Sequence, residues 1–182
     1  MFIQTEATPN PATLKFIPGQ QVLDTGSADF ANSEAADRSP LARRLFEVES
    51  VERVFLSTDF ISVTKSDGEW HHLKPAILGV IMEHFTSGQP VLEAGSGAPD
   101  ADDGAEDDDV VRQIKELLDT RVRPVVAQDG GDIVYHGFEN GIVFLHMQGA
   151  CAGCPSSSMT LKHGIENMLK HYIPEVAEVQ QI

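Results

Sequence analysis

Two cysteines, Cys151 and Cys154, stand three positions apart in this 182-residue chain and are its only cysteines. A thiolate is both a nucleophile and a metal ligand, so a Cys-x-x-Cys pair is typical of a metal site or of a redox-active dithiol. Two inert, buried cysteines are the remaining interpretation. A structural disulfide is not expected in a chain that stays in a reducing compartment.

The residues around this pair predict a loop that leads from the end of a strand into the start of a helix. Pro155 suits a first helical turn, where its missing N–H costs nothing, so Cys154 should lie near the N-cap. The free N–H groups and the dipole of that helix end would stabilise a thiolate at Cys154. Gly149 and Gly153 tolerate positive φ and would let backbone N–H groups turn toward sulfur.

Two thiolates do not complete a tetrahedral Cys₄ set or supply the four cysteines of an ordinary [4Fe–4S] cluster. A histidine could add a ligand, although a lone histidine is more often a surface or packing residue. The seven histidines are His71, His72, His84, His136, His146, His163 and His171. The simplest completion is two-fold symmetry, in which each of two chains contributes both cysteines. The metal would then stabilise a homodimer.

Charge and hydropathy exclude several classes of partner. The formal net charge is -15, from 28 acidic and 13 basic residues, so phosphate backbones and anionic lipid should be repelled. We therefore expect no nucleic acid and no membrane among the partners. No apolar run approaches the roughly 18 residues of a membrane span, and the first six residues do not resemble a signal peptide. The expected compartment is the bacterial cytoplasm, or the mitochondrial matrix if this is a processed organellar form.

A change in composition divides the chain near its middle. Residues 95–99 read Gly-Ser-Gly-Ala-Pro, and seven of the ten residues from 100 to 109 are acidic. Such a segment has too little apolar surface to offset the entropy of ordering it. We expect an acidic flexible linker over residues 91–108 that joins an N-terminal α+β domain (1–90) to a C-terminal domain (109–182).

The N-terminal domain shows alternating strand and helix signals. Strands are predicted over 2–6, 14–17, 51–57 and 60–65. Ser39 and Pro40 predict a helix start as N-cap and first residue, and a second helix is expected over 74–86, ended by Gly88. The order strand, strand, helix, strand, strand, helix indicates a small α+β fold. Phe60 and Trp70 are interpreted as packing residues.

The C-terminal domain reads as helix, hairpin, cysteine loop and helix, so the whole chain is assigned to the α+β class. A helix over 108–122 should end at Arg123-Pro124. Residues 129–132 are interpreted as a plain turn rather than a metal or phosphate loop. Strands over 133–138 and 142–148 flank Asn140-Gly141, a strong hairpin signal. A helix from Pro155 should stop at Pro174, before a short strand over 176–180.

An ordered series of motifs resembles the NifU C-terminal-like domain of Nfu iron–sulfur scaffold proteins. The series comprises Arg123-Pro124, Asp129-Gly130-Gly131-Asp132, Asn140-Gly141, the segment from Gly149 to Ser157, Thr160-Leu161-Lys162, Gly164-Ile165-Glu166 and Pro174-Glu175-Val176. Phe2 to Glu6, Thr8 to Pro11 and Leu14 to Phe16 resemble the Nfu N-terminal domain. The resemblance implies one [4Fe–4S] cluster per homodimer, held by Cys151 and Cys154. It also implies a non-enzymatic carrier that connects upstream cluster-assembly proteins with apo iron–sulfur targets.

Three other functions of the cysteine pair remain open at this point. A thiol-redox enzyme also places Cys-x-x-Cys between a strand and a helix, although usually after a βαβ pattern rather than a hairpin. A structural protein could hold zinc between two chains as a Cys₄ site. Nucleophilic catalysis would need a base such as His163, and no acid is obviously placed to orient that histidine.

Overall fold

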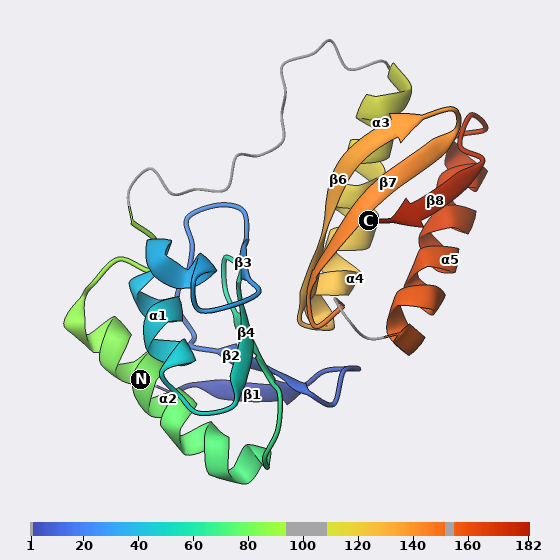
Figure 1. Cartoon of the computed structure of the whole chain (residues 1–182). Coiled ribbons are helices and arrows are strands. Elements are labelled where there is room, and N and C mark those ends of the chain that lie inside the picture. Colours follow the sequence, from blue (N-terminus) through green and yellow to red (C-terminus); the bar gives the residue numbers. More distant parts are fainter. Residues whose placement is uncertain (1, 94–108, 152–154) are drawn as a thin grey trace. The chain divides into compact units, whose positions relative to one another are not determined.

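A computed structural model describes residues 2–93, 109–151 and 155–182 of the chain, with side chains from residue 159 onward in the last range (Figure 1). The chain divides into two compact units, Met1–Ala98 and Pro99–Ile182. Most of the expected acidic linker lies outside the described residues, as does Cys154. Among the described residues, no helix is long and apolar enough to cross a membrane.

The first unit is a five-stranded antiparallel sheet with two helices packed on it (Figure 1). The strands are β1 (Gln4–Ala7), β2 (Thr13–Ile17), β3 (Ala28–Phe30), β4 (Val51–Leu56) and β5 (Ile61–Lys65), in the spatial order β1-β2-β5-β4-β3. A short 3₁₀ helix, η1 (Ala35–Arg38), precedes α1 (Pro40–Phe46), and α2 (Trp70–Ser87) follows β5. Apolar side chains from both helices and from alternate strand positions form one core.

The start of α1 is fixed by the residues that the sequence indicated. Ser39 is the N-cap, and its hydroxyl accepts a hydrogen bond from the Ala42 N–H at 3.1 Å. The same hydroxyl donates to the Val91 carbonyl at 2.6 Å. The Ser39 hydroxyl therefore joins the segment after α2 to the start of α1. No local pattern in the sequence predicts this contact.

Two expectations for the first unit were incomplete. The edge strand β3 was not predicted, because three residues are too short to show an alternating pattern. Helix α2 begins at Trp70, four residues before the expected start, and includes Pro75 in its second turn.

The interpretation of two aromatic residues as packing residues is confirmed. Phe60 is buried, and Trp70 packs against the core while its Nε1 donates to the Pro11 carbonyl at 3.1 Å.

The second unit is a three-stranded sheet with helices packed on one of its faces (Figure 1). Helix α3 (Asp109–Leu117) runs through a π-helical segment, η2 (Leu118–Val122), into α4 (Arg123–Gln128). The hairpin of β6 (Gly131–Glu139) and β7 (Ile142–Gly149) follows, then α5 (Pro155–Tyr172) and β8 (Glu178–Gln181). Strand β8 pairs in parallel with β7. Val143, Leu145 and Met147 alternate inward from β7 toward the helices.

The hairpin turn is confirmed, and the end predicted for the first helix is wrong. Asn140 and Gly141 both have positive φ, at 51° and 79°, as a two-residue type I′ hairpin turn requires. Proline was expected to end the helix at residue 122, but the helical path continues to Gln128. The Arg123 N–H reaches back to the Leu118 carbonyl, which opens a wider turn before Pro124. That turn accommodates a proline ring that would clash with the carbonyl four residues earlier in a regular helix.

Candidate metal centre

Cys151 comes two residues after the end of β7 and lies inside the second unit. Strand β7 ends at Gly149, and α5 begins at Pro155, so Cys151 lies in the expected connection between a strand and a helix. Cys151 is only 4% exposed and belongs to the same apolar cluster as Val143, Leu145 and Met147. Its partner in the motif, Cys154, lies outside the described residues.

The backbone of Gly131 lies against Cys151. Gly131 and Gly149 are paired at the open end of the hairpin. A Cβ on residue 131 would lie 2.7 Å from Cys151 Sγ and 2.7 Å from the Gln148 carbonyl oxygen, which is closer than real Cβ contacts come. The Ala150 N–H donates to the Gly130 carbonyl at 3.1 Å. The base of the cysteine loop is therefore seated on the turn between α4 and β6.

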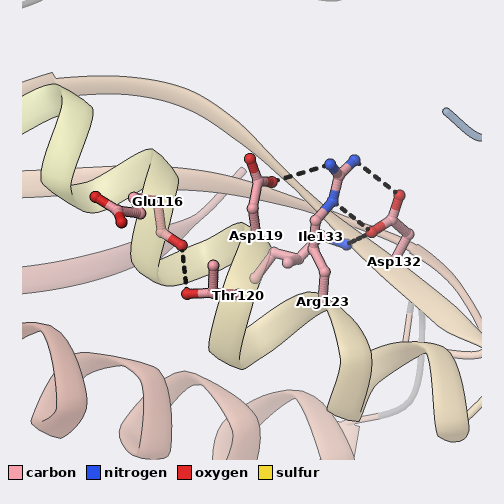
Figure 2. Close-up of polar contacts among 6 residues, drawn as sticks. All are labelled: Glu116, Asp119, Thr120, Arg123, Asp132 and Ile133. Carbon is pink, nitrogen blue, oxygen red and sulfur yellow. Dashed lines mark hydrogen bonds and ion pairs between the residues drawn. The ribbon is translucent and has the colours of Figure 1, made fainter. Parts of the chain in front are cut away.

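An ion pair joins the start of α4 to the start of β6, on either side of that turn (Figure 2). Arg123, the first residue of α4, holds Asp132 with both arms of its guanidinium: Nε donates to Oδ1 at 3.1 Å, and Nη2 donates to Oδ2 at 3.2 Å. Asp132 Oδ1 also accepts from the Ile133 N–H at 2.8 Å. A second carboxylate, Asp119, accepts from Arg123 Nη1 at 3.0 Å. A two-armed pair of this kind fixes direction as well as distance.

The pKa of the Arg123 guanidinium reflects the two carboxylates around it. Partial burial acts to lower the pKa of its guanidinium, but the charges and hydrogen bonds of Asp132 and Asp119 outweigh burial. The pKa of Arg123 therefore lies above its ordinary value. The side chain of Asp132 is only 12% exposed, so the pair is screened less by solvent than a surface ion pair would be.

Residues 129–132 are more important to the site than their sequence indicates. They were interpreted as a plain turn, and they do form the connection between α4 and β6. They also bring Gly131 against Cys151, which lies 20 residues further along the chain. The signal in the sequence was two consecutive glycines followed by an acid, with an arginine nine residues before that acid. It could be interpreted only once the hairpin register was known.

The histidines are dispersed over both units. His71 and His72 are exposed on α2, with ring centroids 4.0 Å apart, and His84 is buried on the same helix. His136 and His146 are exposed on β6 and β7, and His163 and His171 are exposed on α5. Within residues 2–93, 109–151 and 159–182, no three His, Cys, Asp or Glu side chains group as a metal site would require.

An apolar groove borders the start of α5 in the second unit. Helix α5 contributes Leu161, Ile165 and Met168 to it, and the helical path before β6 contributes Val122 and Val125. Arg121 and Asp129 are the charged residues in its lining. Val125 and the nearby Met159 are well exposed, at 53% and 64%. An apolar surface therefore lies on the same helix that follows the cysteine loop.

Comparison with known protein families assigns each unit. Residues 3–88 match the family described as scaffold protein Nfu/NifU N terminal, and residues 114–180 match the NifU-like domain. The two matches fall on the two α+β units, one on each side of the expected linker.

Curated relatives match the whole chain. The chain is 56% identical over 186 residues to the human "NFU1 iron-sulfur cluster scaffold homolog, mitochondrial", covering 100% of this chain and 72% of that protein. It is 55% identical to "NifU-like protein 5, mitochondrial" of Arabidopsis thaliana, covering 100% of this chain and 68% of that protein. Against the Drosophila ananassae scaffold homolog the identity is 53%, over 64% of that protein.

Among solved structures, the chain is similar to a solution NMR structure of a NifU-like protein from Saccharomyces cerevisiae. The identity is 25%, the TM-score is 0.47, and the match covers 52% of this chain and 86% of the other.

Two α+β units, the second with a paired-thiol loop after its hairpin, define a two-domain iron–sulfur cluster scaffold protein. The chain belongs to the Nfu family of these scaffold proteins. The resemblance and the α+β fold class expected from the sequence are thereby confirmed.

Proposed function

We propose that this chain binds a [4Fe–4S] cluster between two copies of itself through Cys151 and Cys154, and transfers it to apo iron–sulfur proteins. The cluster is cargo, so the protein acts as a carrier and not as an enzyme. The observation that carries the proposal is the position of the Cys151 side chain. Its thiol lies where a strand ends and a helix is about to begin, against a glycine at which a Cβ would collide with the sulfur.

The donor chemistry fits an iron–sulfur cluster. Thiolates are the usual protein ligands of such clusters, and the family gives the chain a scaffold role. Each chain has only two cysteines, so four-cysteine ligation of one cluster needs two chains. Gly131 leaves its backbone close to the sulfur without an intervening side chain, which suits a site where a cluster must approach the main chain.

Ligand exchange accounts for transfer. A thiolate of the apo target would form a bond to a cluster iron as the bond from that iron to Cys151 or Cys154 breaks. Repetition at each iron moves the whole cluster without changing its oxidation state. Ligation shared between two chains favours this exchange, because separation of the chains removes half of the carrier's ligands at once.

Anaerobic reconstitution of the full chain with iron and sulfide tests the proposal. We expect about four irons and four sulfides per dimer, a brown visible spectrum, and a doubling of the mass in solution. Cys151→Ser and Cys154→Ser should each abolish loading. His163→Ala is the matched control: it lies on α5 close to the loop in sequence but is not a ligand, so it should load normally.

The alternative functions give different outcomes. A zinc-binding dimer that takes up no iron and sulfide would replace the cluster by a structural Cys₄ site. A metal-free monomer that reduces disulfides would make the cysteine pair a redox dithiol. Either result would overturn the carrier proposal.

The names of the relatives also suggest a cellular compartment for this chain, which we give as a proposal. Their names place them in mitochondria, which favours the mitochondrial matrix over the bacterial cytoplasm for this chain. Localisation of the full-length protein by cell fractionation would test this assignment.

A further inference from the structure

We propose that Arg123 and Asp132 are positioning residues for the cluster-binding thiol of Cys151. This inference rests on the proposed function, because it takes Cys151 to be a cluster ligand. It concerns a pair of side chains that the cysteine motif itself does not include and that come 28 and 19 residues before Cys151 in the sequence.

The first step is the geometry of the ion pair. Arg123 grips both oxygens of Asp132, at 3.1 and 3.2 Å (Figure 2). One oxygen is also tied to the Ile133 N–H at 2.8 Å. The start of α4 and the start of β6 are thus held in a fixed relation across the turn at residues 129 and 130. The ion pair adds to the backbone hydrogen bonds of the turn, which run from the Asp129 N–H to the Val126 carbonyl and from the Gly130 N–H to the Ala127 carbonyl, each at 3.1 Å.

The second step leads from the ion pair to the sulfur. Gly131 lies between the turn and Asp132, and there is no room for a methyl group between its backbone and Cys151 Sγ. The preceding Gly130 carbonyl accepts a hydrogen bond from the Ala150 N–H, next to Cys151. A small displacement of β6 at its first residue would therefore move the seat of the thiol directly.

The charge of Arg123 does not account for a role in stabilising the thiolate. Arg123 is positively charged, but Asp119 and Asp132 both contact it. The three side chains together carry a net charge of -1, so they supply no positive field for a thiolate. We therefore assign their effect on Cys151 to the position of the backbone, as expected of partners that orient a metal ligand without touching the metal.

The experiment uses the full chain, loaded anaerobically with iron and sulfide, with Arg123→Met, Asp132→Asn and the double variant. We expect each single variant to lose its cluster to a chelator about tenfold faster than the unaltered protein, the lower end of the usual cost of removing such a partner. The double variant should be no worse than either single variant, because the two side chains act as one unit. The visible circular dichroism of the bound cluster should change as well.

The chain provides a matched control in its first unit. Arg53 forms an equivalent two-armed ion pair with Asp29, with Nε to Oδ1 at 2.8 Å. Arg53→Met removes the same type of pair from a unit without cysteines, so it should leave cluster lifetime and spectrum unchanged. Arg123→Lys is the conservative variant. An ammonium group keeps the charge but cannot form the bidentate contact. Arg123→Lys should therefore fold, with a cluster lifetime between those of Arg123→Met and the unaltered protein.

A second readout needs no cluster. In a Cys154→Ser background, the alkylation rate of the single remaining thiol of the apo protein reports the surroundings of Cys151. We expect Asp132→Asn to change this rate several-fold while Asp29→Asn leaves it unchanged.

The possible results separate the two proposals. If the unaltered chain takes up no cluster, the proposed function fails and the positioning role fails with it. If it loads normally and the folded variants at positions 123 and 132 match it within twofold in chelation rate, spectrum and alkylation rate, the positioning role is wrong and the carrier function stands. If Arg123→Met and Asp132→Asn do not fold, Arg123→Lys decides: an unchanged lifetime overturns the proposal, and a shortened lifetime supports it.

Discussion

Gly131 and Cys151 are packed so closely that a Cβ on the glycine would lie 2.7 Å from the cysteine sulfur. The contact joins the first residue of β6 to the loop that follows β7. It makes the absence of a side chain at position 131 a requirement of the site, although Gly131 is not among the glycines with positive φ.

Replacement of Gly131 by alanine should therefore disturb the thiol and destabilise the second unit. The added methyl group would meet both Cys151 Sγ and the Gln148 carbonyl, and overpacking of this kind costs about 1–3 kcal/mol. Chemical denaturation and cluster loading measure the two effects. Gly137→Ala on the same strand is the control, because its Cβ would come no nearer than 4.0 Å to Phe144. Equal stability and loading in the two variants would contradict the prediction.

Ser39→Ala should destabilise the first unit by about 1–2 kcal/mol, because it removes a helix cap and leaves the Val91 carbonyl without its 2.6 Å donor. Trp70 is the only tryptophan of the chain and lies in this unit, so its fluorescence in denaturant reports the loss. Ser66→Ala is the control, since the Ser66 hydroxyl makes only an exposed 3.3 Å hydrogen bond to Ser50. A loss at Ser66 as large as that at Ser39 would refute the role of the cap.

His84 should make the first unit less stable in mild acid. Both ring nitrogens are buried without a hydrogen-bond partner among the described residues. Burial and the nearby charge of Arg44 lower the pKa of His84 below 6.5, while the backbone at Gln89 and Pro90 acts in the opposite direction. The unfolded chain then binds the proton more readily than the folded one. The free energy of unfolding should therefore fall as the pH drops through 6.5 toward the lowered pKa.

Measurement of Trp70 fluorescence in urea between pH 7.5 and 5.5 checks this dependence on His84. A leucine at position 84 should reduce the slope of stability against pH, because it removes the proton-binding group. His72→Leu, at an exposed position of the same helix, should leave the slope as it is. The interpretation fails if the slope persists in His84→Leu.

Glu166 should fasten β8 to α5. One oxygen of its carboxylate accepts from Lys170 Nζ at 2.8 Å, and the other accepts from the Val179 N–H at 3.2 Å. The hydrogen bonds from Lys170 and Val179 lower the pKa of Glu166. The contribution of Glu166 to stability is therefore present above the ordinary pKa of a glutamate and is lost as the pH falls through the lowered value.

Glu166→Gln should accelerate hydrogen exchange at the Val179 amide, because a neutral acceptor binds that N–H less strongly than a carboxylate does. Exchange followed residue by residue in NMR spectra measures the change. Glu175→Gln, at an exposed position before β8, provides the control and should leave that amide unaffected. Unchanged exchange in both variants would show that the Glu166 carboxylate does not hold β8.

The local elements of this protein were determined by its sequence. Ser39-Pro40 marks the start of α1, Asn140-Gly141 forms the hairpin turn, and Pro155 begins α5. Each depends on backbone preferences within a few residues, which do not need the rest of the fold. The cysteine spacing likewise indicated the class of chemistry, and the series of motifs around it led to the correct family.

The contacts between distant segments depend on long-range packing. The Ser39 hydroxyl reaches Val91, β3 completes an edge of the first sheet, and the helix expected to stop at Arg123 continues through a π turn. The turn at residues 129–132 looked ordinary because its role depends on the register of β6 against β7. That register brings Gly131 to Cys151, and long-range packing of this kind leaves no periodic or local signal in the order of the residues.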